Sequence, residues 1–209
     1  MPLTLPCHAT PLARYTRGTW TTPEATHPDR DIGSTDYVAA GVHTAPTYLK
    51  WALVFEEPNN RTVWLAKAMP RDWLAAGAEP VVVSRAPTRY GRISYTLTAS
   101  ATSAARAEAS IAQKAASRLP SVTGGASSYR VHANVSLPAT FLGATGPIGG
   151  LRLRLRAPVE HAGKLASVTV GGKAWKDFDA KAETVDFTPT ALASKALLAD
   201  MRDVVAVWG

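Results

Sequence analysis

The chain has 209 residues, of which 46% are hydrophobic, so it can bury one domain core and part of a second. Its 23 lysines and arginines against 16 aspartates and glutamates give a formal charge of +7, spread along the chain without a run of like charges. Because it also lacks the paired cysteines and histidines of common nucleic-acid-binding modules, we do not expect a nucleic-acid partner.

The single cysteine, Cys7, excludes an intrachain disulfide and any cysteine-rich zinc site. The five histidines show no metal-ligand spacing, so the sequence predicts no metal and no other cofactor. The first residues lack the basic and apolar regions of a secretory signal, and no apolar stretch approaches the roughly 18 residues that cross a membrane. We therefore expect a soluble chain and no membrane partner, and the cellular compartment stays open.

The N-terminal part of the chain predicts a long loop followed by helices. Residues 1–35 are rich in proline, threonine and charged residues without a sustained hydrophobic period, which is typical of an irregular loop. From Asp36, apolar residues recur at spacings of three and four, which predicts a helix that Pro46 breaks or kinks and that ends at Pro58. A second apolar group over residues 63–69 predicts a short helix.

These predicted helices carry large apolar side chains but have few partners in the chain against which to bury them. An incomplete helical layer leaves an apolar face exposed. We therefore expect residues 1–78 to dock onto the following domain, onto another subunit or onto a missing N-terminal portion.

After Gly77 the hydrophobic period changes to two, which is typical of β-strands. In residues 151–156 leucines and arginines alternate, so they face opposite sides of a sheet. Gly171 and Gly172 separate two further apolar runs and predict a hairpin, because glycine accepts the positive φ angles of a tight turn. Other predicted strands are 81–83, 90–98, 129–137, 183–187 and 203–208. Residues 79–209 thus predict an antiparallel β-sandwich of about seven to eight strands.

Two intervals depart from this pattern. Residues 99–128 are dominated by alanine and serine and predict a surface insertion that is partly helical or disordered. Residues 190–201 predict one short amphipathic helix before the last strand. The fold class is therefore mainly β, an antiparallel β-sandwich preceded by a partial helical segment.

A candidate binding loop lies near the N-terminus. It places Arg17, Trp20 and Glu24 close together in the sequence, with Asp31 a few residues further on. Sugar sites often combine an aromatic platform with carboxylates that act as acid, base or nucleophile. The simpler alternative is a solvated loop whose charges pair with each other.

The arginines at 152, 154 and 156 and the six tryptophans are further candidates. Each guanidinium offers a planar fork for phosphate or carboxylate groups, but a solvated face of the sandwich is the simpler interpretation of the arginine row. The tryptophans invite carbohydrate stacking, but most of them lie at helical or strand spacing and are interpreted as core residues.

Several strings of residues, taken in their order, resemble a known family. They are LVFEEP at 53–58, WLAKA at 64–68, PRDWL at 70–74, APTRYG at 86–91 and the strand-forming strings at 151–158 and 167–175. They resemble the junction between the catalytic barrel and the C-terminal sandwich of six-hairpin glycosidase-like proteins. The match covers most of residues 36–187.

This resemblance implies that the N-terminal segment, to about residue 75, is the last hairpin of an (α/α)6 barrel whose earlier helices are absent from this chain. It implies a carbohydrate ligand and a general base, for which we choose Glu24, with Asp31 and Asp36 as alternatives. Trp20 then stacks on a sugar, and Arg17 orients a carboxylate or hydroxyl group.

Two functions stay open from the sequence. The first is the C-terminal part of a glycoside hydrolase, inactive alone because the two groups that cleave a glycosidic bond are held about 5 to 10 Å apart and most of the barrel that positions the second is missing. The alternative is a non-catalytic module that binds carbohydrate or another protein. A third interpretation is binding to acidic polymers through the basic surplus, which steep salt dependence would reveal.

Overall fold

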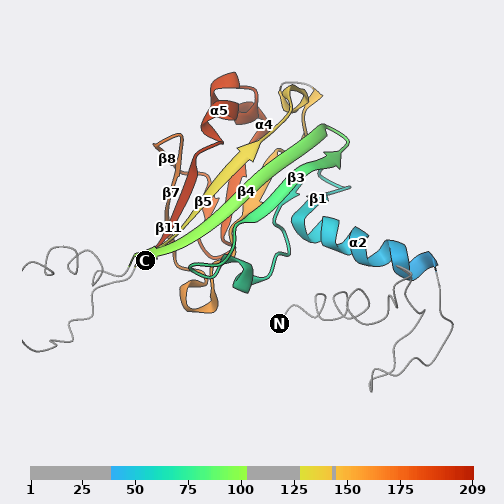
Figure 1. The fold of residues 1–209 in the computed structure, drawn as a ribbon. Helices are drawn as coiled ribbons and strands as arrows, with labels where there is room; N and C mark the ends of the chain where they lie inside the picture. Colours follow the sequence, from blue (N-terminus) through green and yellow to red (C-terminus); the bar gives the residue numbers. More distant parts are fainter. Residues whose placement is uncertain (1–38, 103–127, 143–144) are drawn as a thin grey trace, which may run out of the picture.

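The computed structural model describes residues 39–102, 128–142 and 145–209, which form two facing β-sheets with a helix projecting from one side (Figure 1). The helix is α2, Ala39–Leu53. The prediction of a mainly β fold with a sandwich-like arrangement is confirmed. The candidate loop over 1–35 lies outside these described residues.

The smaller sheet has five strands in the order β1-β2-β6-β10-β9. Their bounds are β1 Val54–Glu56, β2 Val63–Leu65, β6 Leu151–Arg154, β9 Phe178–Asp179 and β10 Thr184–Phe187. β2 and β6 pair in parallel, with Val63 opposite Leu151, and the other pairs in this sheet are antiparallel. A segment near residue 60 is thereby joined to one near residue 150.

The larger sheet has six strands in the order β3-β4-β5-β11-β7-β8, all paired antiparallel. Their bounds are β3 Val81–Thr88, β4 Gly91–Thr102, β5 Ser128–Ser136, β7 Leu165–Val170, β8 Lys173–Trp175 and β11 Val204–Trp208. β3 and β8 are its two edge strands. β4 runs to Thr102 and β5 starts at Ser128, so most of the predicted insertion over 99–128 lies between these strands and outside the described residues.

One hydrophobic core fills the space between the two sheets. Alternate residues of a strand share a face, so β4 sends Ile93, Tyr95 and Leu97 inward, and all three are almost fully buried. From the opposite sheet, Leu151 and Leu153 of β6 meet them, as the alternation over 151–156 predicted.

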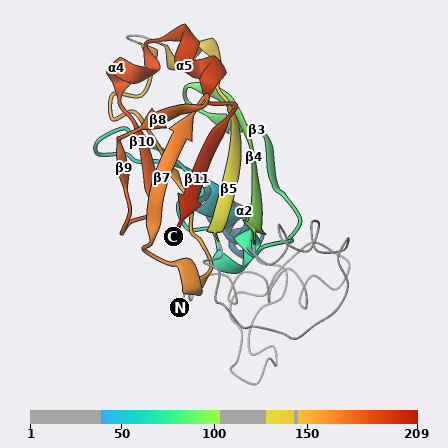
Figure 2. The same ribbon diagram turned by 90° about the vertical axis from the view of Figure 1, so that its left-hand side faces the viewer.

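The C-terminal part follows the predicted elements closely. The β7–β8 hairpin turns at Gly171 and Gly172, whose φ angles are +56° and +73°, as its two glycines predicted. The single helix predicted over 190–201 is instead two short helices, α4 Pro189–Leu192 and α5 Lys195–Asp200. They are separate because the side chain of Ser194 accepts the Leu197 N–H and starts a new helix. Both lie at one end of the sandwich (Figure 2).

The N-terminal elements differ from the prediction. α2 continues through Pro46 and ends at Leu53, and the chain then enters β1. The predicted helix over residues 63–69 is wrong, because this stretch begins with strand β2. Val63 and Leu65 are both fully buried, which is the period of a strand, and three residues are too few to show that period in the sequence.

The structure also corrects the expectation that the apolar side chains of the N-terminal segment have few partners within the chain. Met69 and Leu74 belong to the same core as the strands and are at most 1% exposed, so they have partners within the chain. Among the described N-terminal residues, the exposed large apolar side chains are those of Tyr48, Leu49 and Trp51 on α2.

The C-terminal end of α2 is fastened to the sandwich. The carbonyl oxygen of Leu53 accepts hydrogen bonds from the Ala66 N–H at 2.7 Å and from the Tyr95 hydroxyl at 3.0 Å. The carbonyl oxygen of Ala52 accepts the Ala68 N–H at 3.0 Å. Carbonyl groups in the last turn of a helix lack partners within the helix, so these bonds set the direction in which α2 leaves the sandwich.

Candidate functional site

The residues that the sequence indicated as a site, namely Arg17, Trp20, Glu24, Asp31 and the alternative Asp36, lie outside the described part of the chain. Their roles therefore stay predictions. The described residues form a different candidate site, a pocket at the place where α2, the short 3-10 helix η2 (Arg71–Leu74) and the start of β3 meet.

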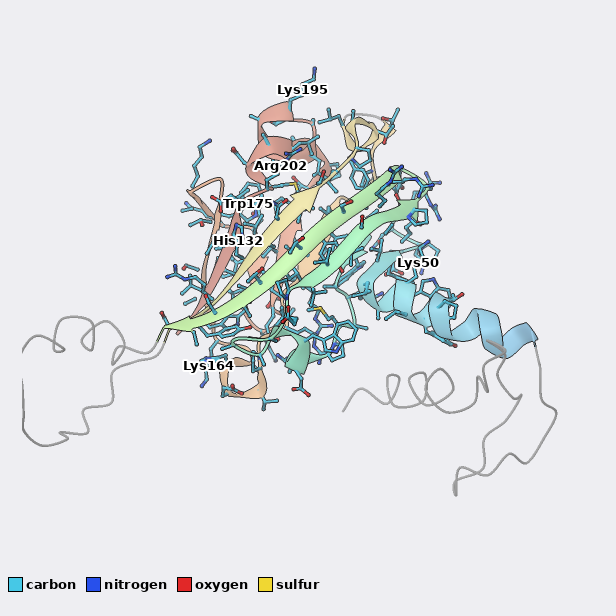
Figure 3. The ribbon with its side chains drawn as sticks, in the orientation of Figure 1. Lys50, His132, Lys164, Trp175, Lys195 and Arg202 are labelled. Atoms are coloured by element: carbon cyan, nitrogen blue, oxygen red, sulfur yellow. The ribbon has the colours of Figure 1, made fainter. Side chains whose placement is uncertain are left out.

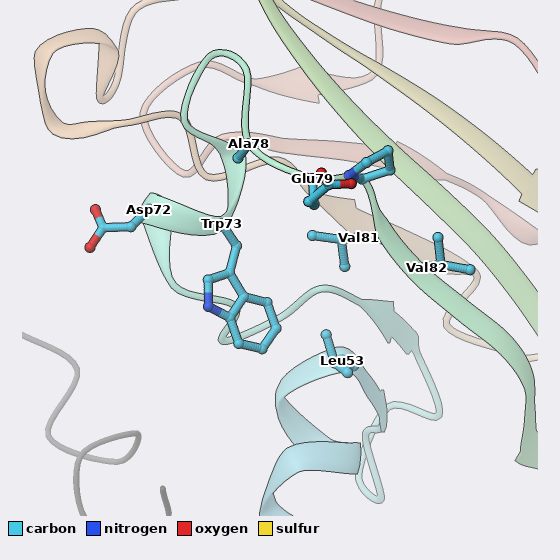
Figure 4. Close-up of a pocket in the computed structure, with 8 residues that line it drawn as sticks. Leu53, Asp72, Trp73, Ala78, Glu79, Val81 and Val82 are labelled. Atoms are coloured by element: carbon cyan, nitrogen blue, oxygen red, sulfur yellow. The ribbon is translucent and has the colours of Figure 1, made fainter.

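This pocket is open to the surface and has a volume of about 450 Å³, within the range of small-molecule sites. Figure 4 shows the indole of Trp73 pointing toward Leu53, with Val81 and Val82 on the neighbouring strand and the Asp72 carboxylate pointing away. The lining residues are Leu53, Asp72, Trp73, Ala78, Glu79, Pro80, Val81 and Val82.

Trp73 is positioned by the burial of its neighbour. Leu74 is 1% exposed, and its carbonyl oxygen accepts a hydrogen bond from the Tyr129 hydroxyl. Burial raises the pKa of Tyr129, so its hydroxyl stays protonated and able to donate. Gly77, with φ +82°, then turns the chain toward β3. Leu74 therefore anchors η2 while Trp73 remains half-buried at the pocket wall.

The pocket can bind a ligand, but few of its side chains could catalyse the cleavage of a bond in that ligand. Its walls are mainly apolar, and its ionisable lining residues are Asp72 and Glu79, both exposed. No lysine, histidine or cysteine lines it. Within the described ranges there is also no cluster of three or more residues of the types that bind metals. The arrangement suits an apolar group with hydroxyl or cationic groups near its rim.

The arginine row on β6 and just after it is engaged with the protein, which corrects the solvated face inferred from the sequence. Arg152 forms a two-pronged contact with Asp186 of β10, with Nη2 2.9 Å from Oδ2. Arg154 donates to the carbonyl oxygen of Lys67 at 3.1 Å, and Arg156 to that of Met69 at 3.2 Å. Arg154 and Arg156 thus fasten the segment that follows β2 to the smaller sheet.

A buried ion pair also joins this segment to the sandwich. Glu183 is 1% exposed, and its carboxylate lies 2.7 Å from the guanidinium of Arg71. Burial lowers the pKa of Arg156, and the positive charges of Arg154 and Arg71 lower it further, whereas Glu183 raises it. Because the cations contact a carboxylate and backbone carbonyls, we assign no phosphate or carboxylate site to this row.

The described tryptophans other than Trp51, which is exposed on α2, fall into three groups. Trp208 is fully buried, and Trp73 and Trp175 are half-buried against the core. Trp64 is half-buried on the outer face of the smaller sheet, where the guanidinium carbon of Arg152 lies 4.8 Å from the centre of its ring system. The interpretation of most tryptophans as core residues therefore holds fully only for Trp208.

Aromatic side chains form an exposed face near the C-terminal end of α2. Trp51 is 46% exposed and meets Tyr48 edge to face at 5.4 Å and Phe55 at 6.2 Å. The ammonium of Lys67 lies 3.7 Å from the centre of the Phe55 ring. These contacts hold the aromatic rings in place at the base of the helix.

Basic side chains are spread over the surface. Lys50 lies on α2, Lys164 on the loop before β7 and Lys195 on α5, on three different sides of the molecule (Figure 3). No helix among the described residues is long and apolar enough to cross a membrane.

The chain matches no protein-family model, no curated protein and no solved structure. The PRDWL string contains Trp73 and Asp72, but nothing in it signals a pocket, because the other walls come from the end of α2 and the start of β3.

Proposed function

We propose that this chain is the C-terminal part of a glycoside hydrolase-like protein, in which the sandwich supports the end of a helical barrel and is inactive alone. The observation that carries the proposal is α2, which is fastened to the sandwich at one end and exposes Leu49 and Trp51. A helix face of this kind suits packing against a further helical layer. This support comes from α2 alone, because the apolar residues after β2 are already buried in the sandwich.

The ordered strings that resemble six-hairpin glycosidases add to this support. LVFEEP covers the end of α2 and strand β1, WLAKA begins in β2, and PRDWL covers η2. These strings thus fall on the structural junction between the helix and the sandwich. Their position agrees with a role in joining two domains.

Under this proposal the catalytic chemistry belongs to the loop before α2 and to the rest of the barrel. Glu24 acts as the general base, with Asp31 and Asp36 as alternatives, while Trp20 stacks on the sugar and Arg17 orients a polar group. The second catalytic carboxyl group comes from barrel residues outside this chain. Carbohydrate is the ligand, and the missing barrel portion or another subunit is the partner.

The test compares this chain with a longer product that includes the reading frame upstream of Met1. We expect that frame to encode helical hairpins and the longer protein to hydrolyse at least one 4-nitrophenyl glycoside, whereas the 209-residue chain shows no turnover. In the longer protein, Glu24→Gln should lower kcat by about 10²- to 10⁴-fold, the size of a general-base contribution. Glu160→Gln, at an exposed carboxylate away from the candidate pocket, is the matched control.

Two results would contradict the proposal. One is an upstream frame without helical hairpins. The other is robust turnover by the 209-residue chain that Glu24→Gln abolishes, because the chain would then carry a complete active site.

The alternative function is a non-catalytic carbohydrate-binding or protein-interaction module, and the observation that favours it is the Trp73 pocket on the sandwich. An NMR titration with oligosaccharides separates the two. Shifts confined to residues 15–36 support the glycosidase part, and shifts confined to sandwich strands support the module.

A further inference from the structure

Strand β3 is an edge of the larger sheet, and only part of that edge is blocked. The register shifts between Val83 and Ala86, Arg85 adopts a φ of +52°, and Pro87 has no N–H to donate. Bulges and prolines are the means by which natural edge strands avoid pairing with other chains. Residues 81–83 precede all of these features, so this short stretch is open to pairing.

The open stretch lies directly at the Trp73 pocket. Val81 and Val82 both line the pocket, and consecutive residues of a strand point to opposite faces. The pocket therefore reaches around the edge of the sheet. Val82 is 65% exposed, while Val81 packs against the core, and Figure 4 shows Trp73 and Leu53 beside them.

The pocket rim is locally acidic in a basic chain. Asp72 and Glu79 are both exposed, and neither forms an ion pair with another described residue. Carboxylates placed beside an apolar pocket favour a ligand that carries positive charge next to an apolar group.

We propose that residues 81–83 and the Trp73 pocket bind an extended segment of a partner polypeptide by strand addition. The peptide backbone pairs with the free edge of β3, one bulky apolar side chain fills the pocket, and flanking lysine or arginine side chains meet Asp72 and Glu79. The aliphatic walls and the strand edge favour a peptide over a saccharide. This inference does not depend on the proposed glycosidase origin.

The probe is the peptide acetyl-Lys-Val-Trp-Val-Lys-amide, titrated into the full ¹⁵N-labelled chain and followed by NMR. We expect amide shifts at residues 81–83 and an indole shift at Trp73. Replacing the central tryptophan of the peptide with alanine should weaken binding at least about tenfold, since the pocket then stays empty. N-methylation of the peptide backbone should weaken it as well, because strand pairing needs those N–H groups.

Variants of the chain test the charge argument without disturbing the core. The double variant Asp72→Lys/Glu79→Lys should weaken the lysine-flanked peptide and strengthen a glutamate-flanked one, whereas Glu160→Lys, at a remote exposed position, should leave both unchanged. The proposal is overturned if millimolar peptide shifts none of residues 81–83 or if the alanine peptide binds equally well. It is also overturned if cellobiose shifts the same amides, or if the chain alone self-associates through β3.

Discussion

Two buried tyrosines join the N-terminal segment to the larger sheet. The hydroxyl of Tyr95 donates to the carbonyl oxygen of Leu53 at the end of α2, and that of Tyr129 donates to the carbonyl oxygen of Leu74 in η2. Burial raises the pKa of both hydroxyl groups above their ordinary value of 10.0. Each side chain must stay protonated to donate, so the two junctions depend on neutral tyrosine.

High pH is therefore expected to destabilise the fold. In the unfolded chain these tyrosines lose their protons near pH 10.0, while the native state retains them. The unfolded state then binds fewer protons, so the contribution of these tyrosines to the free energy of unfolding is constant below that pH and decreases as the pH rises above it. Urea unfolding at a series of pH values measures this decrease, and Tyr95→Phe should make it shallower. An identical pH dependence in Tyr95→Phe would contradict the assignment.

The β7–β8 hairpin shows how a single turn uses its two glycines differently. Both have positive φ, at +56° for Gly171 and +73° for Gly172. A Cβ atom on Gly171 lies 2.5 Å from Cγ of Asp200, whereas one on Gly172 meets nothing within 4 Å. Gly172 is thus favoured only because of its backbone conformation. Gly171 is favoured also because a side chain there would clash with Asp200.

We expect Gly172→Ala to lower the free energy of unfolding by about 1 kcal/mol, the usual cost of a left-handed residue with a side chain. Gly171→Ala should cost more, because the methyl group also displaces the side chain of Asp200 in α5. Adding Asp200→Ala should recover part of that extra loss, since the ion pair between Asp200 and Lys173 is exposed and contributes little. Equal destabilisation by the two glycine variants in urea unfolding would refute this explanation.

The elements that the sequence predicts well are those with a local pattern. The alternation over 151–156 and the Gly171–Gly172 turn can be recognised without knowing their neighbours. β1 and β2 were missed because three residues show no period and because β2 pairs with β6, far away in the sequence. The connection between the parallel strands β2 and β6 is long, so no short turn motif in the sequence marks their pairing.

At the scale of the whole molecule, the segment before residue 79 supplies part of the sandwich. Val63, Leu65, Met69 and Leu74 are at most 1% exposed and share one core with Trp208. β1 and β2 also form one side of the smaller sheet. The sandwich is therefore built from both predicted parts of the chain.

Two truncations test this arrangement. Removal of residues 1–78 should abolish cooperative unfolding, because the core loses β2, η2 and the backbone groups that Arg154 and Arg156 bind. Removal of residues 1–38 should preserve cooperative thermal unfolding followed by circular dichroism, since the core described above lies entirely outside that range. A chain starting at residue 79 with a sharp thermal transition would show that the N-terminal strands are dispensable.

The sequence does not indicate the candidate pocket, because its walls come from segments that are distant in the sequence. Trp73 and Asp72 are adjacent in the sequence, but Leu53 and Val82 reach the same pocket from different elements. The edge of β3 becomes visible only when the strand order is known. By contrast, the loop with Arg17, Trp20 and Glu24 is a local cluster that the sequence suggests by itself, and its role remains a prediction.

The sequence alone determined that the chain is mainly β, where its longer strands and its hairpin lie, and that a helix precedes them, because each of these follows from hydrophobic period or turn chemistry within a few residues. The tertiary structure decided that residues 54–56 and 63–65 are strands and that Arg154 and Arg156 bind backbone carbonyl groups. It also decided which edge of the larger sheet stays open beside a pocket. These outcomes depend on contacts between distant segments, and the free energy of such contacts outweighs the weak local preferences that the sequence displays.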